Sequence, residues 1–343
     1  MNKQTIENLD KNNMFSVIKD LYKHVEHSFE IIEESSLHKV DRFKNIVICG
    51  MGGSAIGGDF VKTVLFNELT IPIYVNRDYN LPNWTDSKSL VIICSYSGNT
   101  EESISCLKQS IDLDINPLII SSGGYILNKA IENNYSYVQL PPGIQPRAAF
   151  GYSASLLLLT LNKLNLIKDE LKKGLFDSIN ILKNMSDELS DICDDNRAIM
   201  FSSKIYNKYP IIYGTPLTDI VSLRFRCQLA ENTKILSSHF MIPEQNHNEI
   251  EGFLNANMEN LAIIWIYDID DHPQNIKRVK LTSSILEEIK DQYRFCESGE
   301  NLVIRLFKLI YFFDWVSFYG AMHNNINPTP VDTILQLKSL MSK

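Results

Sequence analysis

Short apolar runs that alternate with helical patterns decide which fold class this chain can adopt. Residues 45–50 (Asn-Ile-Val-Ile-Cys-Gly) form one such run, which ends in glycine. A run without polar alternation is typical of a strand that is buried on both faces of a parallel sheet. Similar runs predict strands at 71–75, 89–95, 117–121 and 135–140, with helical patterns between them at 54–66, 100–110 and 126–133. This alternation predicts an α/β fold with a mainly parallel sheet.

The second half of the chain repeats this layout with different loop sequences, as a degenerate duplication would. The apolar pattern predicts strands at 209–214 and 261–267, and helices at 152–166, 169–193, 219–232, 279–292, 302–323 and 330–342. A chain of 343 residues is long enough for two domains. We therefore expect an N-terminal helical segment (1–40), a first α/β domain (41–166), a helical connection (167–195) and a second α/β domain with a C-terminal helix (196–343).

Composition and charge argue against several classes of protein. The formal net charge is −8 and no basic cluster is evident, which argues against a nucleic-acid partner. Residues 1–13 lack the apolar core of a signal peptide, and no apolar stretch is long enough to span a membrane. The six cysteines are scattered, without CxxC or metal-ligand spacing, and Cys49 and Cys94 at the ends of apolar runs are expected to be buried. We expect a cytoplasmic protein without a membrane partner, a disulfide framework, a metal or a cofactor.

The first candidate binding loop is Gly-Met-Gly-Gly-Ser-Ala-Ile-Gly-Gly-Asp at 50–59. It joins a predicted strand to a predicted helix, and its glycines, including Gly53, permit close backbone approach. Ser54 falls at the helix N-terminus, where unpaired N–H groups and the helix dipole favour an anion. The loop lacks the Gly-Lys-Ser/Thr of a Walker A motif. Taken alone, Ser54 is equally well explained as a helix N-cap.

The second candidate loop is Ser-Tyr-Ser-Gly-Asn-Thr-Glu at 95–101, which again links strand to helix. Ser95, Ser97 and Thr100 place three hydroxyls within six residues, although a threonine N-cap followed by glutamate is also a plain capping arrangement. Ligands of open α/β sheets bind beyond the carboxyl ends of the strands, where both loops are expected. Capping accounts for each loop alone but not for the repeated hydroxyls, so the two loops together predict a phosphate pocket.

These two loops resemble the phosphate-binding loops of sugar isomerase (SIS) domains. Further segments extend the resemblance, in order, over about 45–338: Pro-Gly-Ile-Gln-Pro-Arg (142–147), Gln-Leu-Ala-Glu-Asn-Thr-Lys (228–234), Pro-Glu-Gln-Asn-His-Asn-Glu-Ile-Glu-Gly (243–252) and Pro-Val-Asp-Thr-Ile-Leu-Gln-Leu-Lys (330–338). Together they resemble the bifunctional phosphoglucose/phosphomannose isomerases of bacteria and archaea. The resemblance implies two SIS-type three-layer αβα domains, each with a mainly parallel sheet.

The resemblance also implies catalytic roles for four residues. Glu231 matches the family's catalytic base, and His247 matches a histidine that assists ring opening in the partner subunit of a homodimer. Lys338 matches a lysine that reaches the ring-oxygen region, and Arg147 could stabilise negative charge on an enediolate. Without the resemblance, Glu231 could be a solvated helix glutamate and His247 a surface or capping histidine. Lys338 could be an exposed cation, and Arg147 could form a structural ion pair.

The implied reaction is a metal-independent aldose–ketose isomerisation without a cofactor. Glucose 6-phosphate and mannose 6-phosphate differ only at C2, so removal of the C2 proton takes both to one cis-enediol and then to fructose 6-phosphate. A non-catalytic SIS module that senses sugar phosphates is the alternative, but it would need neither Glu231 nor His247. The isomerase half of a glucosamine 6-phosphate-forming amidotransferase is a third possibility, which would normally bring a glutaminase domain.

Overall fold

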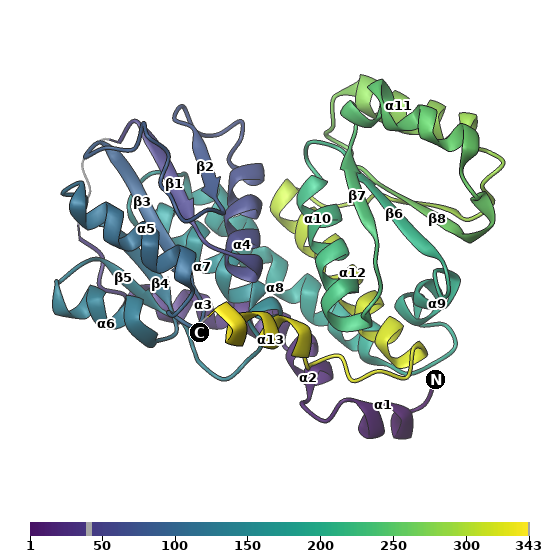
Figure 1. Cartoon of the computed structure of the whole chain (residues 1–343), viewed down its shortest axis with the longest axis horizontal. Helices are drawn as coiled ribbons and strands as arrows, with labels where there is room; N and C mark the ends of the chain where they lie inside the picture. The colour runs from purple at the N-terminus through teal and green to yellow at the C-terminus, as the bar shows by residue number, and fades with distance from the viewer. Residues whose placement is uncertain (39–42, 342–343) are drawn as a thin grey trace. The chain divides into compact units, whose positions relative to one another are not determined.

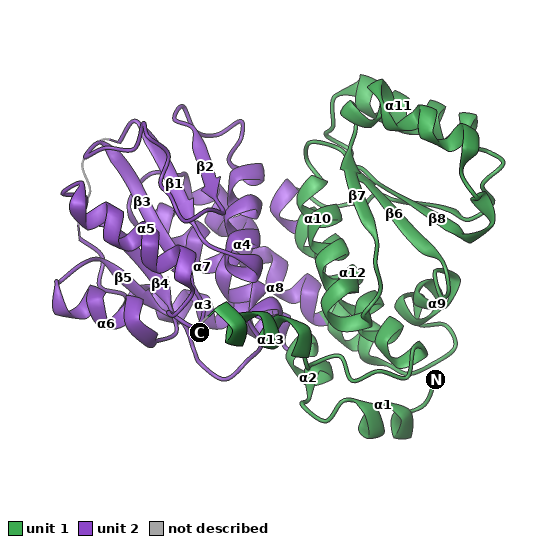
Figure 2. Cartoon of the chain, in the orientation of Figure 1, with its two compact units in different colours: residues 1–19, 184–300, 305–343 green, residues 20–183, 301–304 purple. Residues whose placement is uncertain are grey.

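The computed structural model describes residues 1–38 and 43–341, which form two compact units. Unit 1 contains residues 1–19, 184–300 and 305–343, and unit 2 contains residues 20–183 and 301–304 (Figure 2). Each unit is built around one parallel β-sheet (Figure 1). The predicted α/β class with parallel sheets is therefore confirmed, and both units draw on segments that are distant in the sequence.

Unit 2 holds a five-stranded sheet with the strand order β2-β1-β3-β4-β5. Its strands are β1 (Asn45–Cys49), β2 (Ile73–Asn76), β3 (Ser89–Ser95), β4 (Leu118–Ser121) and β5 (Tyr137–Gln139). Every residue of β1 and β3 is buried, as expected for central strands that are covered on both faces. Burial on both faces explains why apolar runs located β1 and β3 in the sequence.

Helices cover both faces of this sheet, which makes unit 2 a three-layer αβα structure. They are α3 (Leu21–Glu34), α4 (Gly52–Val64), α5 (Glu101–Asp112), α6 (Gly124–Glu132) and α7 (Phe150–Lys163). On one face, Leu107 of α5 and Ile126 of α6 share a core with Val47, Ile93 and Ile119 of the strands. On the other face α4 packs against the sheet and also against α7, which in turn packs against α3.

Unit 1 holds a four-stranded sheet with the strand order β7-β6-β8-β9. Its strands are β6 (Tyr209–Gly214), β7 (Ser238–Met241), β8 (Leu261–Ile266) and β9 (Gln292–Phe295). Its helices are α1 (Lys3–Leu9), α2 (Met14–Lys19), α9 (Arg197–Lys204), α10 (Asp219–Gln228), α11 (Pro273–Ile285), α12 (Leu302–His323) and α13 (Asp332–Met341). The helix α8 (Asp169–Ser190) begins in unit 2 and ends in unit 1, and the first residues of α12 are assigned to unit 2.

The two sheets have corresponding connections. In each unit the first strand is central and leads through a helix to an edge strand, and the chain then returns to the other side of the first strand. By this order β6 corresponds to β1 and β8 to β3. The repeat of layout inferred from the sequence is therefore present in the fold.

The bounds of two helices predicted in unit 1 were wrong by several residues, and two strands were missed. The helix predicted at 279–292 runs from Pro273 to Ile285, and Gln292 begins β9 instead. The Gln292 side chain donates to the carbonyl oxygens of residues 283, 286 and 289, so it caps the end of α11 rather than extending it. The helix predicted at 219–232 ends at Gln228 and continues as a wider π-helical turn, Leu229–Thr233. Sequence analysis also missed β7, whose residues are all partly or fully exposed.

Three further features bear on the sequence-based expectations. All six cysteines are free thiols in the structure, and Cys49 and Cys94 are buried, as predicted. Within residues 1–38 and 43–341, no helix has the length and apolar character needed to cross a membrane. The same residues contain no group of three or more His, Cys, Asp or Glu side chains that could hold a metal ion.

Candidate active site

The loop after β1 supplies Gly53 and Ser54 at the start of α4. The N-cap of α4 is Met51, and Ser54 lies within the first turn, so the N-cap alternative for Ser54 was wrong. Instead, the Ser54 Oγ accepts a hydrogen bond from the backbone N–H of Tyr96 (3.2 Å). This bond joins the two candidate loops directly at the carboxyl edge of the sheet, where the sequence placed them.

The loop after β3 orders its hydroxyls through hydrogen bonds inside the loop. The Ser95 and Thr100 hydroxyl oxygens lie 2.9 Å apart, and the backbone N–H of Gly98 donates to Ser95 Oγ (3.1 Å). Thr100 is the N-cap residue of α5, but its side chain makes no capping hydrogen bond. Ser97 is exposed, and its Oγ accepts from the backbone N–H of Asn99 (3.3 Å). These hydroxyls therefore bond within the loop, and the Thr100 hydroxyl does not cap α5.

Gly98 permits a close approach that no other residue would allow. Its φ is +67°, and a Cβ atom at this position would lie 1.7 Å from the carbonyl oxygen of Gly123. A hydrogen bond also links this loop to the turn between β4 and α6: the backbone N–H of Ile126 donates to the Gly98 carbonyl oxygen (3.0 Å). The β3–α5 and β4–α6 turns therefore form one rigid wall of the candidate site.

A third segment, residues 140–147, closes around the first two loops. The Tyr96 hydroxyl donates to the carbonyl oxygen of Pro141 (2.7 Å) and accepts from the backbone N–H of Ile144 (3.2 Å). A Cβ atom at Gly53 would lie 2.5 Å from the carbonyl oxygen of Pro146, so only glycine fits there. Arg147 follows in a short 3-10 turn and is buried. A small pocket at this junction is lined by Gly53, Ser54, Cys94, Tyr96, Ile120, Leu140, Pro146, Ala149 and Ser153.

Tyr96 is the structural link that sequence reasoning missed. Its backbone N–H bonds to the first loop and its hydroxyl bonds to the third segment. The only signal for it in the sequence was its place between Ser95 and Ser97. Burial raises the pKa of the Tyr96 hydroxyl, which keeps it protonated as a donor.

Glu231 lies in unit 1, in the π-helical turn that follows α10. Its neighbours Asn232 and Thr233 are buried, whereas Glu231 itself is only partly buried. Lys234 ends the turn in the left-handed conformation (φ +60°), and its Nζ donates to the carbonyl oxygens of Glu231 and Pro330. The Lys234 side chain therefore links the backbone of the turn that carries Glu231 to residue 330.

His247 ends a 3-10 turn, residues 244–247, and its side chain is exposed. The adjacent Asn246 is anchored by a hydrogen bond from its Nδ2 to Thr282 Oγ1 (2.8 Å). Two residues on, Glu249 accepts from the Tyr213 hydroxyl (2.9 Å), while burial raises the pKa of the Glu249 carboxyl. The amide-rich segment is therefore tied to the body of unit 1 and leaves His247 at its surface.

Lys338 lies on α13, where no residue is buried. Unit 1 thus carries Glu231, His247 and Lys338, whereas unit 2 carries Arg147 and the five predicted phosphate-binding residues, Gly53, Ser54, Ser95, Ser97 and Thr100. The structure brings Gly53, Ser54 and Ser95–Thr100 together within unit 2, with the segment that carries Arg147 packed against Gly53.

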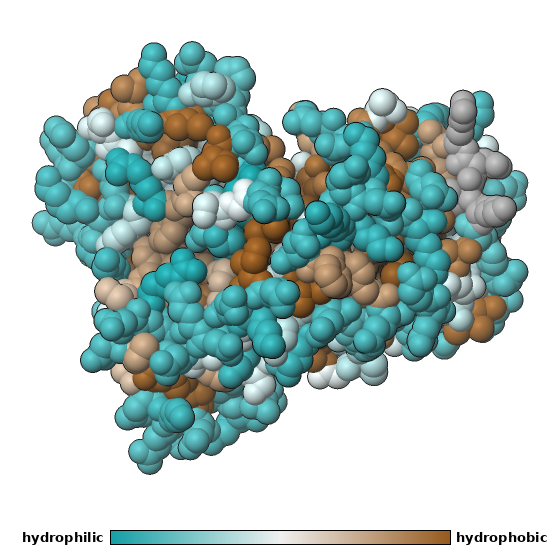
Figure 3. Space-filling model, turned by 180° about the vertical axis from the view of Figure 1, so that it is seen from behind, coloured by the Kyte–Doolittle hydropathy of each residue, from teal (hydrophilic) through white to brown (hydrophobic). Residues whose placement is uncertain are grey.

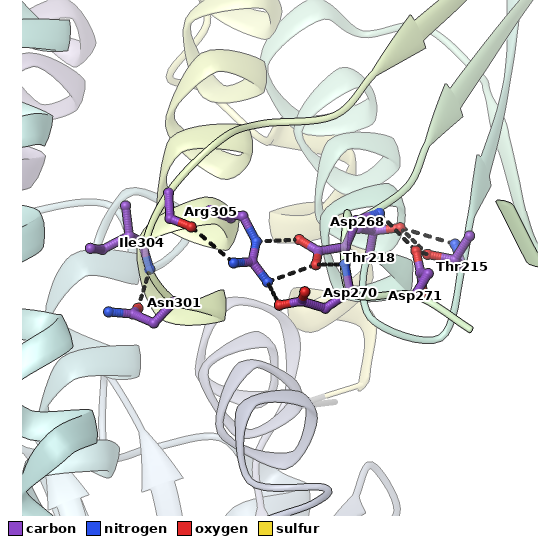
Figure 4. Close-up of polar contacts among 9 residues, drawn as sticks. Thr215, Thr218, Asp268, Asp270, Asp271, Asn301, Ile304 and Arg305 are labelled. Atoms are coloured by element: carbon purple, nitrogen blue, oxygen red, sulfur yellow. Dashed lines mark hydrogen bonds and ion pairs between the residues drawn. The ribbon is translucent and has the colours of Figure 1, made fainter. Parts of the chain in front are cut away.

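The corresponding edge of the unit 1 sheet is closed by carboxylates (Figure 4). Thr215, just after β6, donates its hydroxyl to Asp271 Oδ2 (2.5 Å), and the backbone N–H of Asp268 donates to the same oxygen (2.7 Å). Arg305 holds Asp268 through two hydrogen bonds of 2.8 Å, and both side chains are buried. The Thr215 hydroxyl and the Asp268 N–H at this edge therefore already donate to a carboxylate of the chain itself.

Comparison with known proteins identifies the family. A family model described as bacterial phospho-glucose isomerase C-terminal SIS domain matches residues 194–341. The chain is 33% identical over 337 residues to the bifunctional phosphoglucose/phosphomannose isomerase of Caldicellulosiruptor bescii, across 96% of this chain and 99% of that relative. This chain belongs to the bifunctional phosphoglucose/phosphomannose isomerase family. The Aquifex aeolicus member is likewise 33% identical over 330 residues, across 95% of this chain and 99% of its own length.

Solved structures with low sequence identity to this chain share its fold. The C-terminal domain of glucosamine-fructose-6-phosphate aminotransferase from Francisella tularensis superposes with a TM-score of 0.66 at 16% identity, covering 94% of this chain and 98% of that one. A glucose-6-phosphate isomerase-like protein from Thermus thermophilus gives a TM-score of 0.63 at 14% identity, with 96% of each chain covered. At these identities the likeness shows the SIS-type fold alone.

Proposed function

We propose that this chain interconverts glucose 6-phosphate and mannose 6-phosphate with fructose 6-phosphate. The observation that carries the proposal is the hydrogen bond from the Tyr96 N–H to Ser54 Oγ, which unites two hydroxyl-rich loops at the carboxyl edge of a parallel sheet. Such an edge, with helix N-termini facing it, suits a phosphate group. Family membership supplies the second support, because the related chains carry this activity in their names.

In the proposed mechanism Glu231 is the base that moves the proton between C2 and C1. His247 assists opening of the sugar ring, and Lys338 acts near the ring oxygen. The Arg147 guanidinium stabilises the negative charge that develops on the enediolate oxygen. Because glucose 6-phosphate and mannose 6-phosphate give the same cis-enediol, one base can serve both. No metal or cofactor takes part in these steps.

We further propose a cytoplasmic homodimer in which His247 acts in the site of the partner subunit. Support comes from the exposed position of His247 and from large apolar side chains on the surface of unit 1, such as Leu236 (80% exposed) and Leu254 (76% exposed). Figure 3 shows hydrophobic residues among the hydrophilic ones on one face of the chain. A cytoplasmic location agrees with phosphorylated substrates, which carry charge and do not cross membranes unaided.

Proton transfer through Glu231 can be tested by isotope exchange. With fructose 6-phosphate in D₂O, the unmodified chain should form glucose and mannose 6-phosphates labelled with deuterium at C2, as followed by NMR. Glu231→Gln should lose both turnover and exchange yet still bind fructose 6-phosphate in calorimetry, because only the base is removed. Glu259→Gln, an exposed change of the same kind in unit 1, is the control.

Two outcomes would overturn this proposal. Normal turnover by Glu231→Gln would remove Glu231 as the base. Binding of hexose phosphates without any turnover by the unmodified chain would instead indicate a sugar-phosphate sensor.

The shared site can be tested by mixing two inactive variants, Glu231→Gln and His247→Ala. If His247 acts across the dimer, each mixed dimer has one site with both residues intact. Random reassociation should then restore about one quarter of the unmodified activity. A mixture that stays inactive, although light scattering shows dimers that exchange subunits, would place His247 in its own subunit's site.

A further inference from the structure

We infer that Asp314 and Ser317 of α12 are positioning residues that hold the π-helical turn carrying Glu231 in its working orientation. The inference rests on the proposed role of Glu231. It is drawn from a line of buried hydrogen bonds within unit 1 that runs along α10, through the turn and onto α12.

The first part of this line is a buried ion pair. Arg224 of α10 donates from Nε to Asp314 Oδ1 (3.0 Å) and from Nη2 to Asp314 Oδ2 (2.7 Å). One turn further on, Gln228 Nε2 donates to the same Asp314 Oδ1 (3.0 Å). All three residues are at most 3% exposed, so water does not compete for these bonds. The last turn of α10 is thereby fixed in both position and rotation.

The second part holds the turn itself. Asn232 Nδ2 donates to Ser317 Oγ (3.0 Å), and the Thr233 hydroxyl donates to the Ser317 carbonyl oxygen (2.8 Å). Ser317 Oγ in turn donates to the carbonyl oxygen of Asp314 (2.7 Å), which links this part to the ion pair. Asn324, the residue after the end of α12, donates to the carbonyl oxygen of Thr233 (3.1 Å).

The π-helical geometry explains why these contacts orient Glu231. Arg224, Gln228 and Asn232 are spaced by four residues and all bond to α12. A π turn contains more residues per turn than an α-helix, so Asn232, like Gln228 before it, faces α12 and bonds to it. Polar groups that anchor both neighbouring turns therefore decide where the Glu231 carboxylate points.

The close approach of α12 to the turn supports the same conclusion. A Cβ atom at Gly320 would lie 3.0 Å from Thr233 Cγ2, so the backbone of α12 packs closely against the Thr233 side chain. A catalytic base must be held to within a fraction of an ångström, because a misplacement of about 1 Å can lower the rate by about 100-fold. Loss of one anchoring bond should therefore affect catalysis more than it affects binding.

The test uses Ser317→Ala and Asp314→Asn in the full-length chain. Ser317→Ala removes the acceptor for Asn232, and we expect kcat for fructose 6-phosphate to fall by at least about tenfold while KM stays within about twofold. The matched control is Ser110→Ala on α5, which also deletes a fully buried hydroxyl that donates to a helix carbonyl oxygen. Ser110→Ala should lose comparable stability with an unchanged kcat.

Both positioning variants must be folded for the comparison, so thermal unfolding is measured beside kinetics. Asp314→Asn should show the same fall in kcat if this variant folds. If Asp314→Asn does not fold, the kinetics of Ser317→Ala alone test the inference. A wild-type kcat in folded Ser317→Ala, or a loss confined to KM, would overturn the inference. If Glu231→Gln is inactive while Ser317→Ala is normal, only this inference fails; if Glu231→Gln turns over normally, the proposed function fails first.

Discussion

At the scale of single residues, the hydroxyls of the candidate phosphate site differ in what else they do. Ser95 and Thr100 bond to each other and Ser54 holds Tyr96, so these hydroxyls also support the structure. Ser97 is exposed, and its Oγ accepts a long hydrogen bond from the backbone N–H of Asn99 (3.3 Å). Ser97 is therefore the position where substrate binding can be separated from folding.

We predict that Ser97→Ala raises KM for hexose 6-phosphates by about fivefold, which corresponds to the loss of about 1 kcal/mol from one hydrogen bond to the phosphate. The midpoint of thermal unfolding should not change. Steady-state kinetics and calorimetric scanning measure the two effects. Ser203→Ala, at an exposed position of α9, serves as the control. An unchanged KM for Ser97→Ala would mean that phosphate does not contact this hydroxyl.

Another residue-scale prediction concerns His24, a buried histidine on α3. Its ring stacks on Tyr152 with the centroids 4.6 Å apart, and burial lowers the pKa of His24 to about 4. The folded state therefore keeps the neutral ring, whereas the unfolded chain takes up a proton near its ordinary pKa of about 6.5. Stability of unit 2 should be complete above that pH and should decrease as the pH falls toward 4.

The contribution of His24 can be isolated with His24→Phe, which keeps an aromatic ring beside Tyr152 but cannot titrate. Between pH 6.5 and 4 the free energy of unfolding of the unmodified chain should fall more steeply, by up to about 1.4 kcal/mol per pH unit. Urea unfolding at a series of pH values measures the difference. Parallel pH profiles for the two chains would show that His24 does not contribute.

At the scale of secondary-structure elements, the turns that follow the strands are more constrained than the helices they begin. Gly98 has a positive φ and leaves no room for a Cβ atom beside Gly123. Gly123, in the neighbouring turn, has nothing within 4 Å of its Cβ position. Gly123 is therefore a suitable control position for a substitution at Gly98, because the two glycines lie in adjacent turns and only Gly98 would clash.

We predict that Gly98→Ala distorts the β3–α5 turn, because the new methyl group would overlap the Gly123 carbonyl and the backbone would be strained. Stability should fall by about 2 kcal/mol or more, and binding of fructose 6-phosphate should weaken by at least about tenfold. Gly123→Ala should have little effect on either quantity. Chemical unfolding and titration calorimetry measure both, and equal effects of the two changes would contradict the clash.

At the scale of the whole molecule, the two sheets have the same layout, but the described residues at their carboxyl edges differ in chemistry. The edge in unit 2 offers hydroxyls and helix N-termini. At the corresponding edge in unit 1, Thr215 and the backbone of Asp268 donate to Asp271, whose carboxyl pKa is raised by burial. The carboxylate of Asp271 thus occupies donors that an external phosphate would need.

We therefore predict one hexose phosphate per chain rather than two, as measured by titration calorimetry. Asp271→Asn should destabilise unit 1 by about 1–3 kcal/mol, because Thr215 and the Asp268 N–H would share a weaker acceptor. KM for hexose phosphates should remain unchanged. A stoichiometry of two, or a changed KM with normal stability, would show that the second edge also binds substrate.

Local patterns were sufficient for much of this architecture. The bounds predicted for β3, β6 and α12 agree with the structure, because most residues of these elements are buried and apolar. The strands β7 and β9 were missed because they are short and partly exposed. The N-terminal helical region was predicted as well, but not that Phe15 packs on Trp315 within unit 1 (centroids 5.0 Å).

The amino-acid sequence by itself determined the parallel α/β class and the two hydroxyl-rich turns at strand ends, because periodicity and turn chemistry are properties of neighbouring residues. The tertiary structure alone decided that Tyr96 joins those turns, that Asp271 closes the corresponding edge of unit 1, and that the turn bearing Glu231 is anchored to α12. Asn232 and Ser317 are 85 residues apart, and no local pattern relates them. Such contacts form only when the folded core brings distant segments together.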